Sequence, residues 1–131
     1  MKLSQEAVSE YNQIHSYDNG QVVIRPQHQT RLDSIESNFI LTRDHLITDW
    51  TVRQIETISA EQLAELEQLD PEVILFATGS GLCLEFQKIA QSLMQSHIGV
   101  EFMELGAACR TFNLLVSEQR KVLLAVSFDT V

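Results

Sequence analysis

Two short segments in the second half of the chain combine residue types that are able to bind or attack a small molecule. One is a glycine loop made of Thr78, Gly79, Ser80 and Gly81. The other opens a helical pattern and contains Cys109, Arg110, Thr111 and Asn113. Each segment follows an apolar run, and open α/β sheets bind ligands in the loops beyond the carboxyl ends of such strands. These residues therefore form the candidate recognition surface.

The glycine loop has the chemistry of an anion site. Glycine lets backbone N–H groups approach an anion closely, and a following helix adds its positive amino end. The dinucleotide fingerprint needs a third glycine three residues after Gly81, where this chain has Leu84, and no Lys-Ser or Lys-Thr pair follows for a P-loop. The loop therefore favours a small anion or a carboxylate over a nucleotide. The need for glycine in any tight turn between strand and helix is the alternative explanation.

Cys109 admits two interpretations. A thiol in the first turn of a helix, beside the guanidinium of Arg110, can have a lowered pKa and act as a nucleophile. A free cysteine is also commonly a small buried apolar residue. A nucleophile needs a base, and nothing in the spacing of the four histidines ties one of them to Cys109. We therefore expect Cys109 to pack in the core, with the nucleophile as the alternative.

The polar residues around Cys109 also leave two alternatives open. Arg110 and Asn113 are three residues apart and share a helix face, which either faces solvent or forms the wall of a site. Thr111 falls on the apolar side of the predicted helix, with Leu114. The sequence contains no Cys/His cluster with zinc spacing and no GxSxG nucleophile motif. We predict no catalytic residue, no metal and no cofactor.

The elements that must position these residues form an alternating pattern over residues 71–128. Apolar runs at 72–77, 100–103 and 122–126 predict strands, and helical spacing predicts helices over 82–96 and 107–118, with a turn at Gly106. The nearly continuous apolar run at 72–77 is typical of an interior strand. The short connections imply parallel strands joined by right-handed crossovers.

The first half of the chain reads as β structure. Asn19 and Gly20 favour a type I′ hairpin between strands at 11–16 and 21–25. Apolar runs at 38–42 and 46–50 predict two more strands around a polar turn at 43–45, and 52–57 is expected to be extended. Ser59 and Gln62 form a capping box that begins a helix, and Pro71 marks its end.

Composition narrows the classes of partner. The chain has 131 residues, which predicts a single domain over residues 1–131, and a net charge of −9. Basic residues are scattered, so neither nucleic acids nor anionic membranes are expected partners. The absence of an apolar run of roughly 20 residues argues against membrane insertion. Two cysteines without a CxxC pair, and a start resembling neither a signal peptide nor a transit peptide, predict a cytoplasmic location.

Several stretches together resemble a known family. They are Pro71-Glu72, the run 78–81, the run 99–103, the run 107–115, Glu118 and Arg120. The chain resembles domain-of-unknown-function family 498/598, which also contains the mitochondrial respiratory complex I assembly factor 3. The resemblance implies an α/β fold of three layers: a mixed central sheet with a βαβαβ C-terminal half, and an additional antiparallel β layer from the N-terminal half.

The resemblance also implies a role in assembly through protein contacts, and it supplies no catalytic residue. Leu105 and Phe112 stand where the family pattern has Thr and Tyr, so two hydroxyl groups of a family site are missing. The leading hypothesis is a bacterial, cytoplasmic, non-enzymatic interaction or assembly factor with a protein partner. The alternative is a small-anion or metabolite-binding protein, or an enzyme using Cys109, with its site at the strand carboxyl ends. Self-association through the N-terminal hairpin is a third hypothesis.

Overall fold

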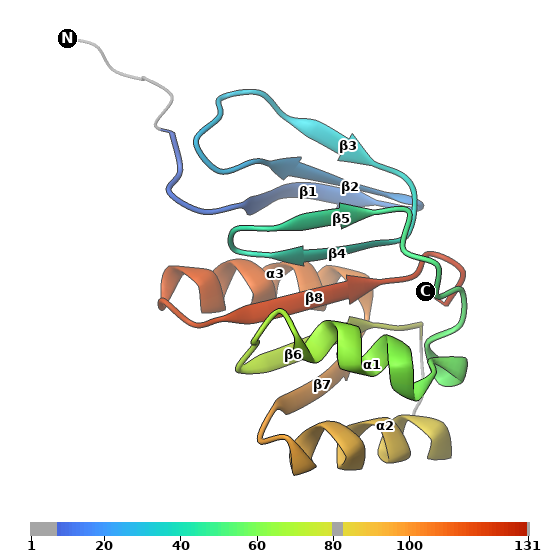
Figure 1. Cartoon of the computed structure of the whole chain (residues 1–131). Helices are drawn as coiled ribbons and strands as arrows, with labels where there is room; N and C mark the ends of the chain where they lie inside the picture. Colours follow the sequence, from blue (N-terminus) through green and yellow to red (C-terminus); the bar gives the residue numbers. More distant parts are fainter. Residues whose placement is uncertain (1–7, 80–82, 131) are drawn as a thin grey trace, which may run out of the picture.

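The computed structural model describes residues 8–79 and 83–130, which form two β-sheets and the helices that cover them (Figure 1). The first sheet is antiparallel and comes from the N-terminal part of the chain, with the order β1-β2-β3. Its strands are β1 (Gln13–Asp18), β2 (Gln21–Arg25) and β3 (Asp33–Ile35). A β-bulge interrupts the β1/β2 pairing between Ile14 and Ser16.

The second sheet is mixed and has the strand order β5-β4-β8-β6-β7. Its strands are β4 (Phe39–Thr42), β5 (Leu46–Thr48), β6 (Val73–Ala77), β7 (Gly99–Met103) and β8 (Val122–Val126). β6 pairs in parallel with both β7 and β8, whereas β4 pairs antiparallel with β5 and β8. The prediction that residues 72–77 form an interior strand among parallel neighbours is confirmed.

Within the described residues, three α-helices and one 3-10 helix connect the strands. They are η1 (Ile55–Thr57), α1 (Ala60–Glu67), α2 (Leu84–Gln95) and α3 (Leu105–Ser117). The predicted capping box is present: the Ser59 hydroxyl accepts a hydrogen bond from the Gln62 N–H, and the Gln62 side chain accepts one from the Ser59 N–H. Each helix follows or precedes a strand over a short connection, as the alternating pattern predicts.

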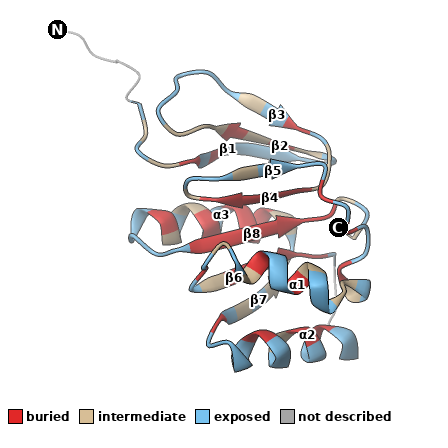
Figure 2. Cartoon of the chain, in the orientation of Figure 1, coloured by how far each residue is buried: buried red, intermediate tan, exposed pale blue. Residues whose placement is uncertain are grey.

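Side chains along each strand of the mixed sheet point alternately to its two faces, and each face carries a hydrophobic core. In β8, Leu123 and Ala125 pack with α1 and α2, whereas Val122, Leu124 and Val126 pack with α3 and the antiparallel sheet. All five residues of β8 are buried, because both faces of this strand are covered (Figure 2). The predicted three-layer α/β class with a mixed central sheet is therefore confirmed, and α3 shares its layer with the antiparallel sheet.

Two predictions about the first half were wrong. Gly20 has φ of +79°, but Asn19 is not among the residues with positive φ, so the hairpin turn is not type I′. A single positive φ at the second central residue fits a type II turn, and the nearby bulge adds strand twist that such a turn lacks. Residues 52–57 are not all extended, because the chain turns into η1 to bury Ile55 completely.

Two predictions about α3 were also wrong. Gly106 is not a turn residue but lies inside the helix, which begins at Leu105. The buried face is not the one that contains Leu114, which is 57% exposed. It is formed by Gly106, Ala108, Cys109, Phe112 and Val116. Two sheets pack against this helix, so their positions rather than local hydrophobicity decide which face is buried.

Candidate functional site

An open cleft lies at the carboxyl ends of the parallel strands, which we call the carboxyl edge. Its volume is about 720 Å³. The lining comes from the ends of β6, β7 and β8, the first turn of α3 and the β1–β2 turn. The residues are Tyr17, Asp18, Asn19, Gly20, Thr78, Gly79, Glu104, Leu105, Gly106 and Phe128. Hairpin residues from the antiparallel sheet thus face the end of the mixed sheet.

The first predicted segment contributes Thr78 and Gly79 to the cleft. Thr78 is buried, and its N–H donates to the Met103 carbonyl over 2.8 Å, so the β6/β7 ladder continues into the loop. Gly79 is exposed at the cleft wall. The other two predicted residues, Ser80 and Gly81, lie outside the described residues.

Glu104 occupies the amino end of α3. It is the N-cap residue, and its carboxylate accepts a hydrogen bond from the Ala107 N–H over 3.2 Å. Because a carboxylate already interacts with the positive end of the helix, a second anion there would meet like charge. The role of Glu104 had no clear signal in the sequence, because Glu is not among the preferred N-cap residues Ser, Thr, Asp and Asn.

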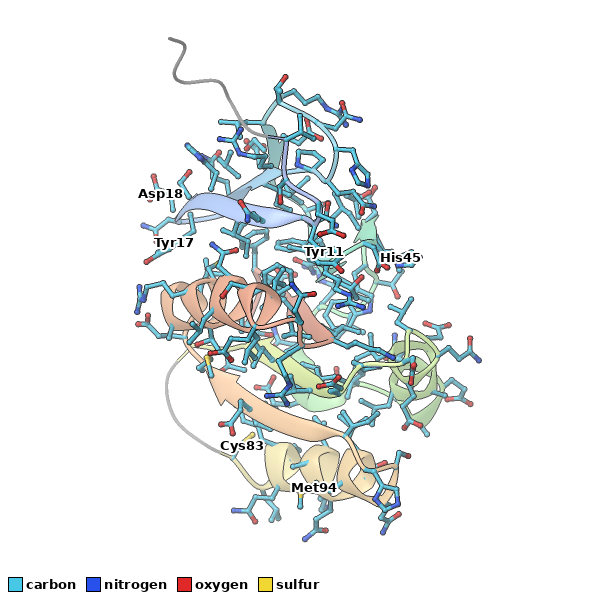
Figure 3. All side chains as sticks on the ribbon, turned by 90° about the vertical axis from the view of Figure 1, so that its left-hand side faces the viewer. Tyr11, Tyr17, Asp18, His45, Cys83 and Met94 are labelled. Atoms are coloured by element: carbon cyan, nitrogen blue, oxygen red, sulfur yellow. The ribbon has the colours of Figure 1, made fainter. Side chains whose placement is uncertain are left out.

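Arg110 reaches the antiparallel sheet rather than the glycine loop. Its guanidinium donates to the Tyr17 hydroxyl over 2.5 Å. The contact passes over Gly106, where an added Cβ would lie 3.0 Å from the Tyr17 ring and 3.1 Å from both Arg110 Nη1 and Glu104 Oε1. Figure 3 shows Tyr17 and Asp18 at the same end of β1, with Tyr17 on the side toward α3 and Asp18 on the other side. Gly106 thus lets the hairpin approach the first turn of α3.

Asn113 fastens β1 to α3. Its side-chain oxygen accepts a hydrogen bond from the Ile14 N–H, and its side-chain nitrogen donates to the Ile14 carbonyl, both over 2.8 Å. Ile14 lies at the bulge on the edge strand of the antiparallel sheet. Arg110 and Asn113 therefore both contact β1, and the prediction that their shared face recognises a ligand stays a prediction.

Cys109 lies in the core at 1% exposure, among residues of both sheets. Burial raises the pKa of its thiol to about 12, and the smaller opposing effect of the Arg110 charge does not reverse this. A protonated and inaccessible thiol is a poor nucleophile. The structure therefore favours the packing interpretation. Thr111, next along the helix after Arg110, is half-buried and does not line the cleft.

The opposite ends of the parallel strands, which we call the amino edge, have different chemistry. Arg120 Nε donates to Glu72 Oε1 over 2.7 Å, and Lys121 Nζ donates to Asp70 Oδ2 over 3.1 Å. The hydrogen bond from Arg120 holds the pKa of Glu72 below its ordinary value. Two smaller hollows of about 260 and 350 Å³ flank these pairs. Two carboxylates, Asp70 and Glu72, are thus paired with cations of the chain at this edge.

Among residues 8–79 and 83–130, no group of three or more His, Cys, Asp or Glu side chains is arranged to hold a metal ion. Within the same residues, none of the helices combines the length and apolarity required to cross a bilayer.

Solved structures define the class of fold. A Xanthomonas campestris protein solved by NMR superposes with a TM-score of 0.74 at 28% identity, over 98% of this chain and 93% of that protein. A Bordetella pertussis protein described as an Mth938-like domain superposes with a TM-score of 0.70 at 23% identity, covering 99% of this chain and 94% of the other. The chain thus has the mixed α/β fold of Mth938-like domains.

The family follows from the sequence of residues 14–127, which match the family described as "Protein of unknown function (DUF498/DUF598)". The chain belongs to this family, so the resemblance is confirmed. A "13 kDa major membrane protein" of Francisella tularensis is 34% identical over 71 residues, covering 54% of this chain and 58% of that protein. An "NADH dehydrogenase [ubiquinone] 1 alpha subcomplex assembly factor 3" of Xenopus tropicalis is 33% identical over 76 residues, covering 56% and 42%. The matches span about half the length of these curated relatives.

Proposed function

We propose that this chain is a non-enzymatic interaction or assembly factor that binds a protein partner through the cleft at the carboxyl edge. The observation that carries the proposal is its similarity to assembly factor 3 of the NADH dehydrogenase alpha subcomplex. An assembly factor acts by holding protein segments, which requires an accessible surface rather than a reactive group. The cytoplasmic location and bacterial origin expected from the sequence are part of the same proposal.

The build of the cleft supports this role. It is open, and its lining contains the aromatic residues Tyr17 and Phe128 beside the backbone of Gly20, Gly79 and Gly106. Aromatic side chains are enriched in protein interfaces, and glycines let a partner approach the backbone closely. The nearby thiol of Cys109 is buried, so it does not offer the partner a reactive group.

Site-specific cross-linking in the native host tests the proposal. A photoreactive amino acid at Asn19, an exposed residue of the cleft, is compared with the same amino acid at Ser96, an exposed residue beside an amino-edge hollow. We expect one reproducible protein cross-linked from position 19 and not from position 96, identified by mass spectrometry. The absence of any reproducible product from position 19, or equal products from both positions, would contradict the proposal.

A second candidate is a metabolite-binding protein, favoured by the cleft volume of about 720 Å³, which falls in the range of small-molecule pockets. Native mass spectrometry of the protein purified from its host separates the two functions. A stoichiometric small-molecule adduct that Gly79→Trp removes would favour the metabolite. Unliganded protein, together with a cross-linked partner at position 19, would favour the interaction factor.

A further inference from the structure

The charges and apolar groups of the cleft specify a kind of partner segment. Among the described residues, its lining includes the carboxylates of Asp18 and Glu104 but no lysine, arginine or histidine. The nearest cation is Arg110, beside Gly106, and its guanidinium donates to the Tyr17 hydroxyl. None of the ion pairs formed within the described residues involves Asp18 or Glu104. The chain as a whole carries a net charge of −9. The local and overall charge therefore both favour a cationic occupant.

Both carboxylates are fixed by the backbone. Asp18 Oδ1 accepts a hydrogen bond from the Asn19 N–H over 2.7 Å, and Glu104 Oε1 accepts one from the Ala107 N–H over 3.2 Å. Each bond uses one oxygen, and an ionised carboxylate has acceptor sites on both. Side chains already held in place lose less conformational entropy when a partner binds.

Apolar groups lie beside these carboxylates. Phe128 is half-buried and anchored by its contact with Phe39, with ring centroids 6.1 Å apart. Leu105 is also half-buried, and the Tyr17 ring is 39% exposed next to Asp18. An occupant therefore meets an apolar wall and two carboxylates within one cleft.

We infer that the cleft binds a protein segment that presents an arginine or lysine next to an apolar side chain. The inference rests on the proposed function, because it specifies the chemistry of the partner at the same surface. The cationic group binds a carboxylate of the cleft, Asp18 or Glu104, and the apolar side chain packs on Leu105 and Phe128. A free anion is the opposite chemistry, since the amino end of α3 already interacts with Glu104.

Peptide titration of the full chain, followed by NMR, tests the inference. The probes are short peptides with one arginine beside a leucine or phenylalanine. Their amino ends are acetylated and their carboxyl ends amidated, so that the termini carry no charge. In the matched control peptides, citrulline replaces arginine and keeps its shape without its charge. Gly20, Gly79 and Gly106 line the cleft and report binding there, whereas Gly99 at the amino edge is an internal control.

We expect the arginine peptide to shift the three cleft glycines and not Gly99, and the citrulline peptide to bind at least about tenfold more weakly. Asp18→Asn and Glu104→Gln keep the acceptor oxygens and should each weaken binding about threefold to tenfold, with a smaller effect at high ionic strength. Glu72→Gln removes a charge at the amino edge and should leave binding unchanged.

Four results would overturn the inference: no shift with any arginine peptide, equal affinity for the citrulline peptide, shifts centred on Gly99, or cleft shifts with inorganic phosphate but not with arginine peptides. The proposed function fails separately. If a partner is cross-linked at position 19 and its binding is unchanged by Asp18→Asn and Glu104→Gln, the interaction role is supported and the inference is contradicted. Charge-dependent peptide binding without a cross-linked partner would support the chemistry inferred for the cleft and would contradict the proposed interaction role.

Discussion

At the amino edge of the parallel strands, Glu72 pairs with Arg120 and Asp70 pairs with Lys121, whereas at the carboxyl edge Asp18 and Glu104 accept only backbone N–H groups. Both edges belong to the same sheet and both are exposed. The amino edge pairs these two carboxylates with cations of the chain itself. The carboxyl edge leaves negative charge facing a cleft.

The two edges also differ in how they are built. The amino edge consists of loops between neighbouring elements of the mixed sheet. The carboxyl edge needs the β1–β2 hairpin from the other sheet, which Asn113 and Arg110 attach to α3. The carboxyl edge thus differs from the amino edge because a second sheet completes it and because Asp18 and Glu104 form no ion pair within the described residues.

The largest expected effect concerns the reactivity of Cys109, the buried thiol in α3 near the carboxyl edge. In a Cys83→Ala background, Cys109 should react with iodoacetamide at least about a thousandfold more slowly in the folded protein than in denaturant, because its pKa rises from 9.0 to about 12 and the thiol is buried. Alkylation followed by mass spectrometry measures both rates. A folded-state rate within tenfold of the denatured rate would restore the hypothesis that Cys109 is a nucleophile. The carboxyl edge would then differ from the amino edge by a reactive thiol as well as by its charge.

The next effect concerns the attachment of β1. Asn113→Ala removes the partners of both backbone groups of Ile14, and Ile14 is 6% exposed. We expect a loss of about 1–3 kcal/mol in the free energy of unfolding, measured by chemical denaturation. The matched control is Leu114→Ala on the exposed side of the same helix, with an expected change within about 0.5 kcal/mol. Equal effects would mean that the hairpin is not held by Asn113.

A glycine at each edge sharpens the comparison. Gly106→Val places side-chain atoms against the Tyr17 ring, where even a Cβ would be only 3.0 Å away, and should destabilise the fold by about 1 kcal/mol while displacing Tyr17. Gly99→Val meets its nearest atoms at 3.7 Å in an exposed strand and should change stability by less than about 0.5 kcal/mol. Thermal denaturation ranks the two, and the reverse order would contradict the close approach at the carboxyl edge.

The smallest effect tests internal pairing at the amino edge. The Arg120 hydrogen bond holds the pKa of Glu72 below 4.5, so the pair stabilises the fold at pH values above the unfolded pKa and this contribution is lost as pH falls through the folded pKa. In Arg120→Gln, an NMR titration should show the pKa of Glu72 moving up toward 4.5. An unchanged pKa would show that Arg120 does not balance Glu72.

Much of the scaffold could be predicted because its signals are local. The run 122–126 matches β8 residue for residue, and the capping box of Ser59 marks the start of α1. The position of the cleft was also predictable, since Thr78 and Gly79 line it at the carboxyl ends of the strands, as the rule for open α/β sheets predicts.

The remaining parts of the site depend on contacts between distant residues. Nothing near Asn113 in the sequence indicates that its side chain binds Ile14, or that Arg110 binds Tyr17. The buried face of α3 likewise depends on two sheets that no helical pattern describes. Glu104 caps α3 although Glu is not a preferred N-cap residue, so its role too is visible only in the structure.

The Asn113–Ile14 contact joins residues that are 99 positions apart in the chain. During synthesis the β1–β2 hairpin leaves the ribosome long before α3 has been made. The hydrogen bonds between Ile14 and Asn113 cannot form until that helix is present. Such a non-local contact raises the contact order of the fold and slows its closure. The cleft therefore cannot be complete before the chain has been made as far as Phe128, and a nascent chain with a formed hairpin but no α3 does not yet have it.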